Sequence, residues 1–230
     1  MNPFTSILAA TDFSLDGNNA VRRAALLAHA HGAHLRILHV VNAAGCKPLR
    51  EWFSPTVDTD LKAAQARAAL RRAAGEILAA YDVPATVEVA VGDPLATLMQ
   101  ASQQADLVVL GQRGHSRLET LLIGRTADRM IRTSQRPVLV VKKAAQGPYR
   151  QVLAPVDFTA CSEAALQFAA LAGRGAHVQV FHARDAQLES VLRRSDVAES
   201  TIHAVRTREE AATRARMHRW PPGSASTARR

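Results

Sequence analysis

Cysteine is scarce in this chain of 230 residues, which contains two, Cys46 and Cys161. They lie far apart and in no spacing typical of zinc sites or redox motifs, so the sequence does not belong to the disulfide-stapled or cysteine-ligated classes. No apolar run approaches the length of about 20 residues that spans a bilayer. Residues 1–6 show no charged segment followed by an apolar one, which argues against secretion and predicts a cytoplasmic protein.

Aromatic residues are also few, at 4% of the chain, whereas hydrophobic residues as a whole reach 47%. That content is ample for a globular core, and the abundant alanine predicts helices that pack through small side chains. Negative charge is in the minority, and the net charge is +9. The densest arginine run, Arg206–Arg219, also contains Glu209 and Glu210. We therefore expect a solvated helix face there rather than a nucleic-acid site.

A glycine-rich stretch between two short apolar runs carries the strongest functional signal. Leu107–Leu110 and Val138–Val141 each predict a buried strand, and Gly111, Gly114 and Gly124 lie between them. An amphipathic helix is predicted after the third glycine, because proline ends the helical pattern just before the second strand. Glycines let the backbone approach an anion, and a helix start presents free N–H groups, so this arrangement is typical of a phosphate site.

The spacing Gly-x2-Gly-x9-Gly of Gly111, Gly114 and Gly124 resembles that of nucleotide-binding members of the universal stress protein family. In that family a Ser or Thr follows the third glycine, beside the triphosphate. This chain has Arg125 at that position and Thr126 one place later. The resemblance implies that these five residues bind the phosphates of ATP, with Mg²⁺ as a candidate companion. The Arg125 cation could itself pair with phosphate, or its bulk could fill the space.

The same resemblance implies an adenosine site built from Thr11, Asp12 and Val41. Asp12 would contact the adenosine part, and Val41 would line the base pocket. Each residue also has a structural alternative, since Asp12 could stabilise a helix N-terminus and Val41 could belong to the core. No catalytic residue and no metal site is predicted.

Strands alternate with helices along the first part of the chain, which predicts the α/β class with a doubly wound, open parallel sheet. The predicted strands are Ser6–Thr11, Leu35–Val41, Ala85–Val91, Leu107–Leu110 and Val138–Val141. The family resemblance implies the order 3-2-1-4-5 of the adenine nucleotide alpha hydrolase-like fold. In this order the winding reverses between strands 1 and 4, where ligands bind. Asp12 and Gly111, which end those strands, would then share one crevice.

The second half of the chain partly repeats the first. Residues 152–159 (VLAPVDFT) repeat the pattern of residues 7–14 (ILAATDFS), and residues 176–182 resemble residues 33–39. We therefore predict a universal stress protein domain over 1–146, an incomplete second unit over 149–219 that ends in one long helix from Leu188 to Arg219, and a disordered tail over 220–230. Gly147–Pro148 is the predicted linker. The alternative is an unrelated appendage that begins with a similar strand.

The resemblance implies a cytoplasmic ATP-binding sensor or interaction module in the stress response. Two other functions stay open: a nucleotide-free dimerising scaffold, and an ATP-hydrolysing enzyme for which the sequence fixes no nucleophile or base. Val138–Val141 is expected at the sheet edge, and an apolar edge strand favours a partner. We therefore expect a homodimer through Val138–Val141, as the family resemblance also implies. His29, His31 and His34 lack a cysteine or carboxylate at a zinc-site spacing, so we expect no metal there.

Overall fold

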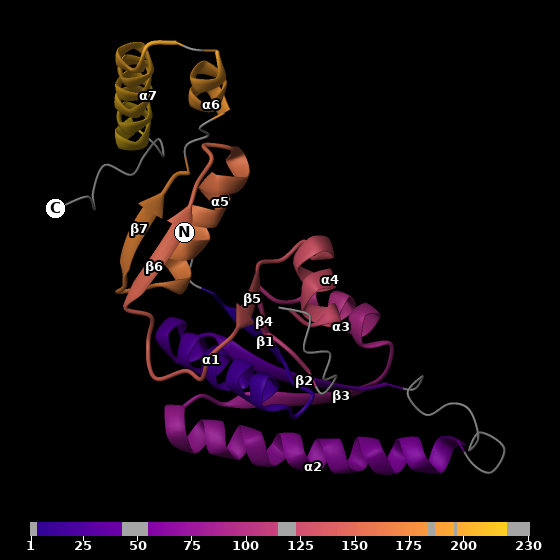
Figure 1. Ribbon diagram of the computed structural model, residues 1–230. Helices are drawn as coiled ribbons and strands as arrows, with labels where there is room; N and C mark the ends of the chain where they lie inside the picture. The colour runs from indigo at the N-terminus through magenta and orange to yellow at the C-terminus, as the bar shows by residue number, and fades with distance from the viewer. Residues whose placement is uncertain (1–3, 43–54, 115–122, 184–186, 196, 220–230) are drawn as a thin grey trace. The chain divides into compact units, whose positions relative to one another are not determined.

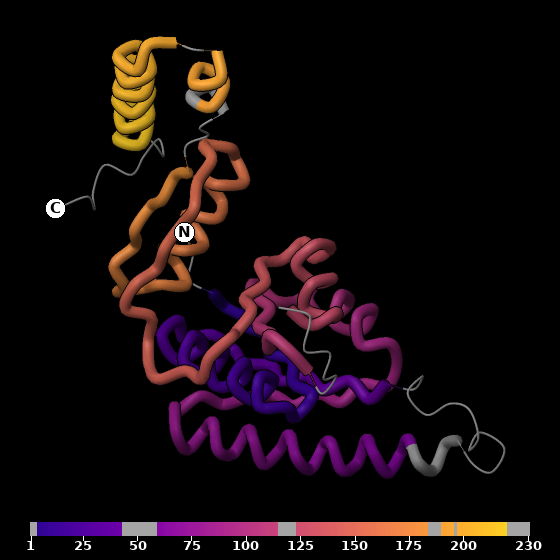
Figure 2. The backbone as a smooth tube through the Cα atoms, viewed as in Figure 1, coloured from indigo at the N-terminus to yellow at the C-terminus, as the bar shows by residue number. Residues whose placement is uncertain are grey.

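The structure is a computed structural model that describes residues 4–42, 55–114, 123–183, 187–195 and 197–219. The chain forms two compact units, Met1–Tyr149 and Arg150–Arg230. Figures 1 and 2 show both units, the first in indigo to magenta and the second in orange to yellow. The predicted tail, 220–230, and Cys46 lie outside the described residues.

The first unit is an open parallel α/β sheet. Its elements are β1 (Ser6–Ala10), α1 (Leu15–His31), β2 (His34–Asn42), α2 (Pro55–Tyr81), β3 (Ala85–Gly92), α3 (Pro94–Ser102), β4 (Leu107–Gly111), α4 (Arg125–Thr133) and β5 (Val138–Val141). The described strands pair in parallel in the order β3-β2-β1-β4-β5. The predicted fold class and strand order are therefore confirmed.

Helices cover both faces of this sheet, with α1 and α2 on one face and α3 and α4 on the other (Figure 1). The central strand β1 is consequently buried from both sides, and Ile7, Leu8 and Ala9 are 0% exposed. A strand that is buried on both faces needs a continuous apolar run, which explains the lack of alternation in this segment. On the α3–α4 face, Leu8 joins a core cluster that includes Leu98 and Met130.

A carboxylate ties together the beginnings of β1 and β4. Asp106 Oδ2 accepts hydrogen bonds from the Thr5 N–H (2.8 Å), the Thr5 hydroxyl (2.6 Å) and the Ser6 N–H (3.1 Å). The hydrogen bond from the Thr5 hydroxyl is the main cause that lowers the pKa of Asp106 below its ordinary value. The two strands are thus joined at their amino-terminal ends, opposite the edge where the glycine-rich stretch begins.

The second unit contains β6 (Gln151–Pro155), α5 (Ala160–Ala172), β7 (His177–Phe181), α6 (Gln187–Arg194) and α7 (Glu199–Arg219). Within the described part, β6 and β7 form a two-stranded parallel sheet. The prediction of one long helix from Leu188 to Arg219 was wrong, because the chain forms two helices there. The Ser195 hydroxyl donates to the Val191 carbonyl (3.0 Å) at the end of α6, a local hydrogen bond that competes with helix continuation.

The turn after β1 and the turn after β6 have the same geometry. Phe13 and Phe158 both adopt the left-handed conformation, with φ of 65° and 64°. Each ring lies against a histidine, His39 at 4.5 Å and His182 at 4.6 Å between centroids. The Nδ1 atoms of these histidines donate to the backbone carbonyl two residues before the phenylalanine, at 2.8 and 2.7 Å. Left-handed phenylalanine is uncommon, and here it recurs in two turns with the same histidine partner.

The helix that follows each of these turns contributes a different residue beside the aspartate, and this difference affects the pKa of the aspartate. In the first unit the residue is Gly17 of α1, where a Cβ would lie 2.9 Å from Asp12 Oδ1. The matching residue in the second unit is Ser162, whose hydroxyl donates to Asp157 Oδ1. Hydrogen bonds from Ser162 and, next in size, from Thr159 lower the pKa of Asp157 to about 2. The second aspartate is thereby satisfied by its own helix.

Of the described helices, not one combines the length and the hydropathy that a membrane span requires.

Candidate functional site

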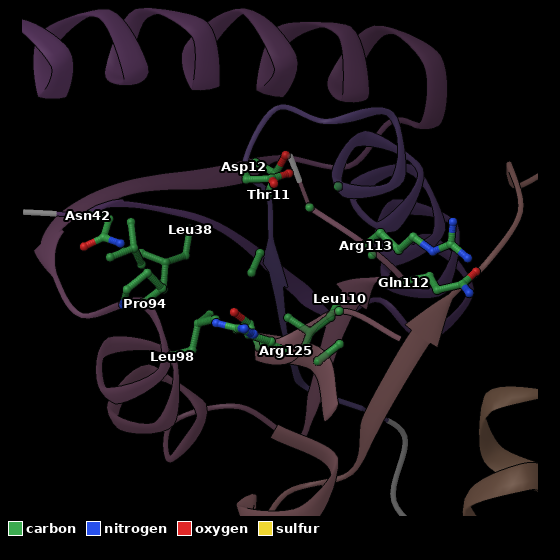
Figure 3. A pocket seen from close by; sticks show the side chains of 18 residues that line it. Thr11, Asp12, Leu38, Asn42, Pro94, Leu98, Leu110, Gln112, Arg113 and Arg125 are labelled. Atoms are coloured by element: carbon green, nitrogen blue, oxygen red, sulfur yellow. The ribbon is translucent and has the colours of Figure 1, made fainter. Parts of the chain in front are cut away.

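A pocket of about 420 Å³ opens at the carboxyl ends of β1 and β4, which are neighbours at the centre of the sheet (Figure 3). Its walls come from the ends of β1, β2 and β4, the glycine-rich stretch, and the first turns of α3 and α4. The volume lies in the range of small-molecule sites. The pocket also lies where the winding of the sheet reverses, which is the general ligand position in open α/β sheets.

Seven of the eight residues predicted for the site line this single pocket. They are Thr11, Asp12, Gly111, Gly114, Gly124, Arg125 and Thr126. The sheet brings them together from segments about a hundred residues apart, because β1 pairs directly with β4.

Val41, the eighth predicted residue, does not line the pocket. Side chains alternate along β2, so Leu38, Val40 and Asn42 face the pocket, whereas Val41 is buried with an exposed fraction of 8%. The assignment of Val41 to the pocket wall is therefore corrected to its neighbours Val40 and Asn42. Leu98, from α3, adds to the same apolar wall.

Asp12 is held close to two glycines. Its Oδ1 accepts a hydrogen bond from the Ser14 N–H at 3.0 Å, and Ser14 in turn caps α1 by accepting from the Gly17 N–H at 3.1 Å. A Cβ on Gly114 would lie 2.5 Å from Asp12 Oδ2, closer than real Cβ atoms approach. Glycine at position 114 therefore lets the backbone of the loop approach the carboxylate from above the sheet.

The glycine-rich stretch is also fixed against the start of α1. A Cβ on Gly111 would lie 2.6 Å from the backbone carbon of Asp16, so α1 crosses directly over the end of β4. The Asp16 carboxylate accepts from the Arg113 N–H at 3.1 Å. The Gly124 N–H donates to the Gln112 carbonyl at 2.8 Å, so the described ends of the stretch are hydrogen-bonded to each other. The backbone around the pocket is thus held by contacts from both sides.

Helix α4 begins at the rim of this pocket. Gly124 is its N-cap and supplies no side-chain cap, so the first-turn N–H groups and the positive end of the helix dipole are left for other partners. Arg125 is the first helical residue, and Figure 3 draws its side chain among the lining residues, with its nitrogen atoms beside Leu98 in this view. The Arg113 side chain extends away from them in the same view.

The pocket thus combines an apolar wall with a positively charged end. Leu38, Val40 and Leu98 supply the apolar wall, and the glycine-rich loop, the start of α4 and Arg125 supply the positive end. Among the lining residues that the structure describes, Asp12 is the one carboxylate. This arrangement can accept a molecule with a flat apolar part and an anionic part, such as a nucleotide.

No metal centre is found in the described part of the chain, where no three His, Cys, Asp or Glu side chains gather closely enough to hold an ion. Two of the three histidines near the end of α1 have other surroundings. His31 is buried with its ring 4.7 Å from that of Phe4, and His34 Nε2 lies 2.7 Å from the Thr86 hydroxyl.

The fold and the pocket define a protein of the doubly wound α/β class with a pocket at its switch point. Residues 3–142 match the model of the universal stress protein family. The chain therefore belongs to the universal stress protein family.

Named relatives agree with this assignment. A universal stress protein of Thermus aquaticus is 31% identical over 143 residues, which are 60% of this chain and 99% of the relative. A universal stress protein of Mycolicibacterium smegmatis is 28% identical over 172 residues, and the matched region spans 71% of this chain but 58% of that relative. A solved universal stress protein of Archaeoglobus fulgidus shares the fold with a TM-score of 0.63 at 20% identity, over 84% of this chain and 75% of the other.

Two further universal stress proteins, matched at TM-scores of 0.43, have structures in complex with cAMP and with dAMP, so those two proteins bind adenine nucleotides.

Proposed function

We propose that this universal stress protein binds ATP in the pocket at the carboxyl ends of β1 and β4. The observation that carries the proposal is the convergence of Asp12, Gly111, Gly114 and Gly124 on one pocket with the open start of α4. The phosphates lie on the glycine-rich loop and the first turn of α4, where backbone N–H groups and the helix dipole favour an anion. The adenosine part lies toward the apolar wall of Leu38, Val40 and Leu98.

The test is calorimetric titration of the purified protein with ATP, beside two variants with the same substitution. Gly114→Asp places a second carboxylate against Asp12, since even a Cβ at that position would lie 2.5 Å from Asp12 Oδ2. Gly75→Asp is the matched control, because a Cβ at Gly75 meets nothing within 4 Å. We expect binding in the parent and in Gly75→Asp, and none in Gly114→Asp. A parent protein that does not bind ATP would overturn the proposal.

The family resemblance further implies that nucleotide occupancy alters a surface that a partner reads in the cytoplasmic stress response. Hydrolysis of ATP is the rival function. Steady turnover that disappears in Asp12→Ala would favour an enzyme, and binding without turnover would favour the sensor.

We also propose that the protein forms a homodimer through β5. This strand pairs with β4 on one side and is the last strand of the described sheet, with Val138, Leu139 and Val140 only half-buried. An apolar edge strand favours pairing with another chain. Sedimentation velocity at micromolar concentration should show a dimer, and Leu139→Lys should give a monomer that still binds ATP. A monomeric parent would contradict this proposal.

We propose, finally, that residues 150–219 are a shortened copy of the first unit. The repeated turn, with its left-handed phenylalanine and its histidine partner, supports this origin. The second unit has no counterpart of the Gly-x2-Gly-x9-Gly sequence. The titration should therefore give one ATP for each chain, and Asp157→Asn should leave the affinity unchanged. A stoichiometry of two would contradict the loss of the second site.

A further inference from the structure

Positive charge predominates among the described residues that line the pocket. Of these residues, Asp12 is the one carboxylate, and Arg113 and Arg125 are cations. Magnesium in nucleotide sites is commonly held by one or two carboxylates together with the phosphates, in near-octahedral oxygen geometry. A divalent ion at the phosphate end of this pocket would have to lie in the field of the Arg125 guanidinium, which disfavours a second cation.

Local contacts orient the oxygen atoms near Asp12. Asp12 Oδ1 accepts from the Ser14 N–H at 3.0 Å, and a Cβ at Gly114 would lie 2.5 Å from its Oδ2. The Thr11 hydroxyl accepts from the Phe13 N–H at 2.9 Å. These contacts orient the oxygen atoms of Thr11 and Asp12 within the turn after β1 and do not arrange them around a metal ion. The residues present therefore fit a Mg²⁺ ion poorly.

The Arg125 side chain, in contrast, is well placed to neutralise phosphate. It extends from the first residue of α4, so its guanidinium and the open N–H groups of that helix serve the same end of the pocket. Figure 3 draws it among the residues that line the pocket. Within the residues that the structure describes, no carboxylate forms an ion pair with it. A guanidinium binds phosphate oxygens through two parallel hydrogen bonds, and its charge persists at every physiological pH.

We propose that Arg125 takes the place of the divalent cation, so that this site binds the free nucleotide anion in preference to its magnesium complex. This inference rests on the proposed function, since it concerns the same pocket. The chemical class of the ligand becomes a metal-free polyphosphate nucleotide. Affinity then increases with the negative charge of the phosphate chain, in the order AMP, ADP, ATP, when no metal is present.

The experiment is calorimetric titration of the full chain with ATP in two buffers, one with EDTA and one with excess Mg²⁺. Three proteins are compared: the parent, Arg125→Ser and Arg129→Ser. Arg129 is the matched control, because it is exposed, lies on the same helix and is not among the pocket-lining residues. Thermal unfolding of all three checks that α4 remains folded.

The parent and Arg129→Ser should bind ATP at least as tightly in EDTA as in Mg²⁺. Arg125→Ser should bind about tenfold or more weakly in EDTA, the effect of one charge-assisted hydrogen-bonded contact. Added Mg²⁺ should restore part of that loss, because the serine opens space and removes the competing charge.

Two results would overturn the inference while leaving ATP binding intact: a parent that binds ATP more tightly with Mg²⁺ than in EDTA, or an Arg125→Ser variant that matches the parent in EDTA. A parent that binds in neither buffer would overturn the proposed function as well, and so the two failures are distinguishable.

Discussion

Replacement of Gly111 by alanine tests whether the backbone of α1 packs directly against the end of β4. The added Cβ would lie 2.6 Å from the Asp16 carbonyl carbon, 2.7 Å from the Asp16 oxygen and 2.8 Å from the Gly17 nitrogen. All three are backbone atoms, so no side-chain rotation relieves the clash. Overpacking of this kind costs about 1–3 kcal/mol, and we expect Gly111→Ala to lie in the upper half of that range.

Gly75→Ala, in the exposed middle of α2, is the matched control. A Cβ there meets nothing within 4 Å, and alanine is favoured over glycine inside a helix by about 1 kcal/mol. The same substitution should therefore destabilise the protein at one position and stabilise it at the other. Urea unfolding followed by far-UV circular dichroism gives both free energies. A Gly111→Ala variant as stable as the parent would show that the end of β4 and the backbone of α1 are not in contact.

Three further predictions concern single side chains. Asp106→Asn should lower the free energy of unfolding at pH 7. The difference from the parent should shrink as the pH falls below about 4, because the lowered pKa of Asp106 stabilises the native state only while the carboxylate is charged. Unfolding curves measured across this pH range check the prediction. Ser162→Gly should raise the pKa of Asp157 from about 2 toward its ordinary value, as measured by NMR titration of the carboxyl carbons. Arg23→Met should remove the 2.7 Å hydrogen bond to the Gly147 carbonyl, destabilise the protein by about 1–3 kcal/mol and speed proteolysis around Gly147.

The sheet could be predicted because its strands are marked locally. The apolar runs that form β1, β4 and β5 are each bounded by glycine, proline or aspartate, and the structure places β5 at the predicted residues, Val138–Val141. The order of the strands came from the family resemblance, since local sequence does not say which strand lies beside which. Ile7 pairs with Leu107, which is distant in the sequence, and this pairing belongs to the tertiary structure.

The errors have physical reasons. Val41 was placed on the wrong face because the run Leu35–Val41 is apolar toward both sides of the sheet, so periodicity does not tell which side faces the pocket. The alternation shown by Leu38, Val40 and Asn42 would have identified that side once one member was assigned. The hydrogen bond from the Arg113 N–H to Asp16 joins residues 97 positions apart, and no local pattern reports it.

The central position of β1 has a consequence for the order in which the sheet assembles. Ile7 pairs with Leu35 on one side and with Leu107 on the other, and the second pairing must close a far longer stretch of chain. Near contacts form before distant ones, so the β3-β2-β1 half is expected to form first and the seam between β1 and β4 to close last.

The pocket proposed for the nucleotide is lined from both sides of that seam, by Asp12 after β1 and by Gly111 at the end of β4. A ligand that binds only the closed form stabilises it by about 2.7 kcal/mol at a hundredfold excess over Kd. The nucleotide concentration would then determine how often β1 and β4 separate along the seam. Proteases or partner proteins that act on the open form would then respond to the lifetime of the closed fold, and no lid would have to move.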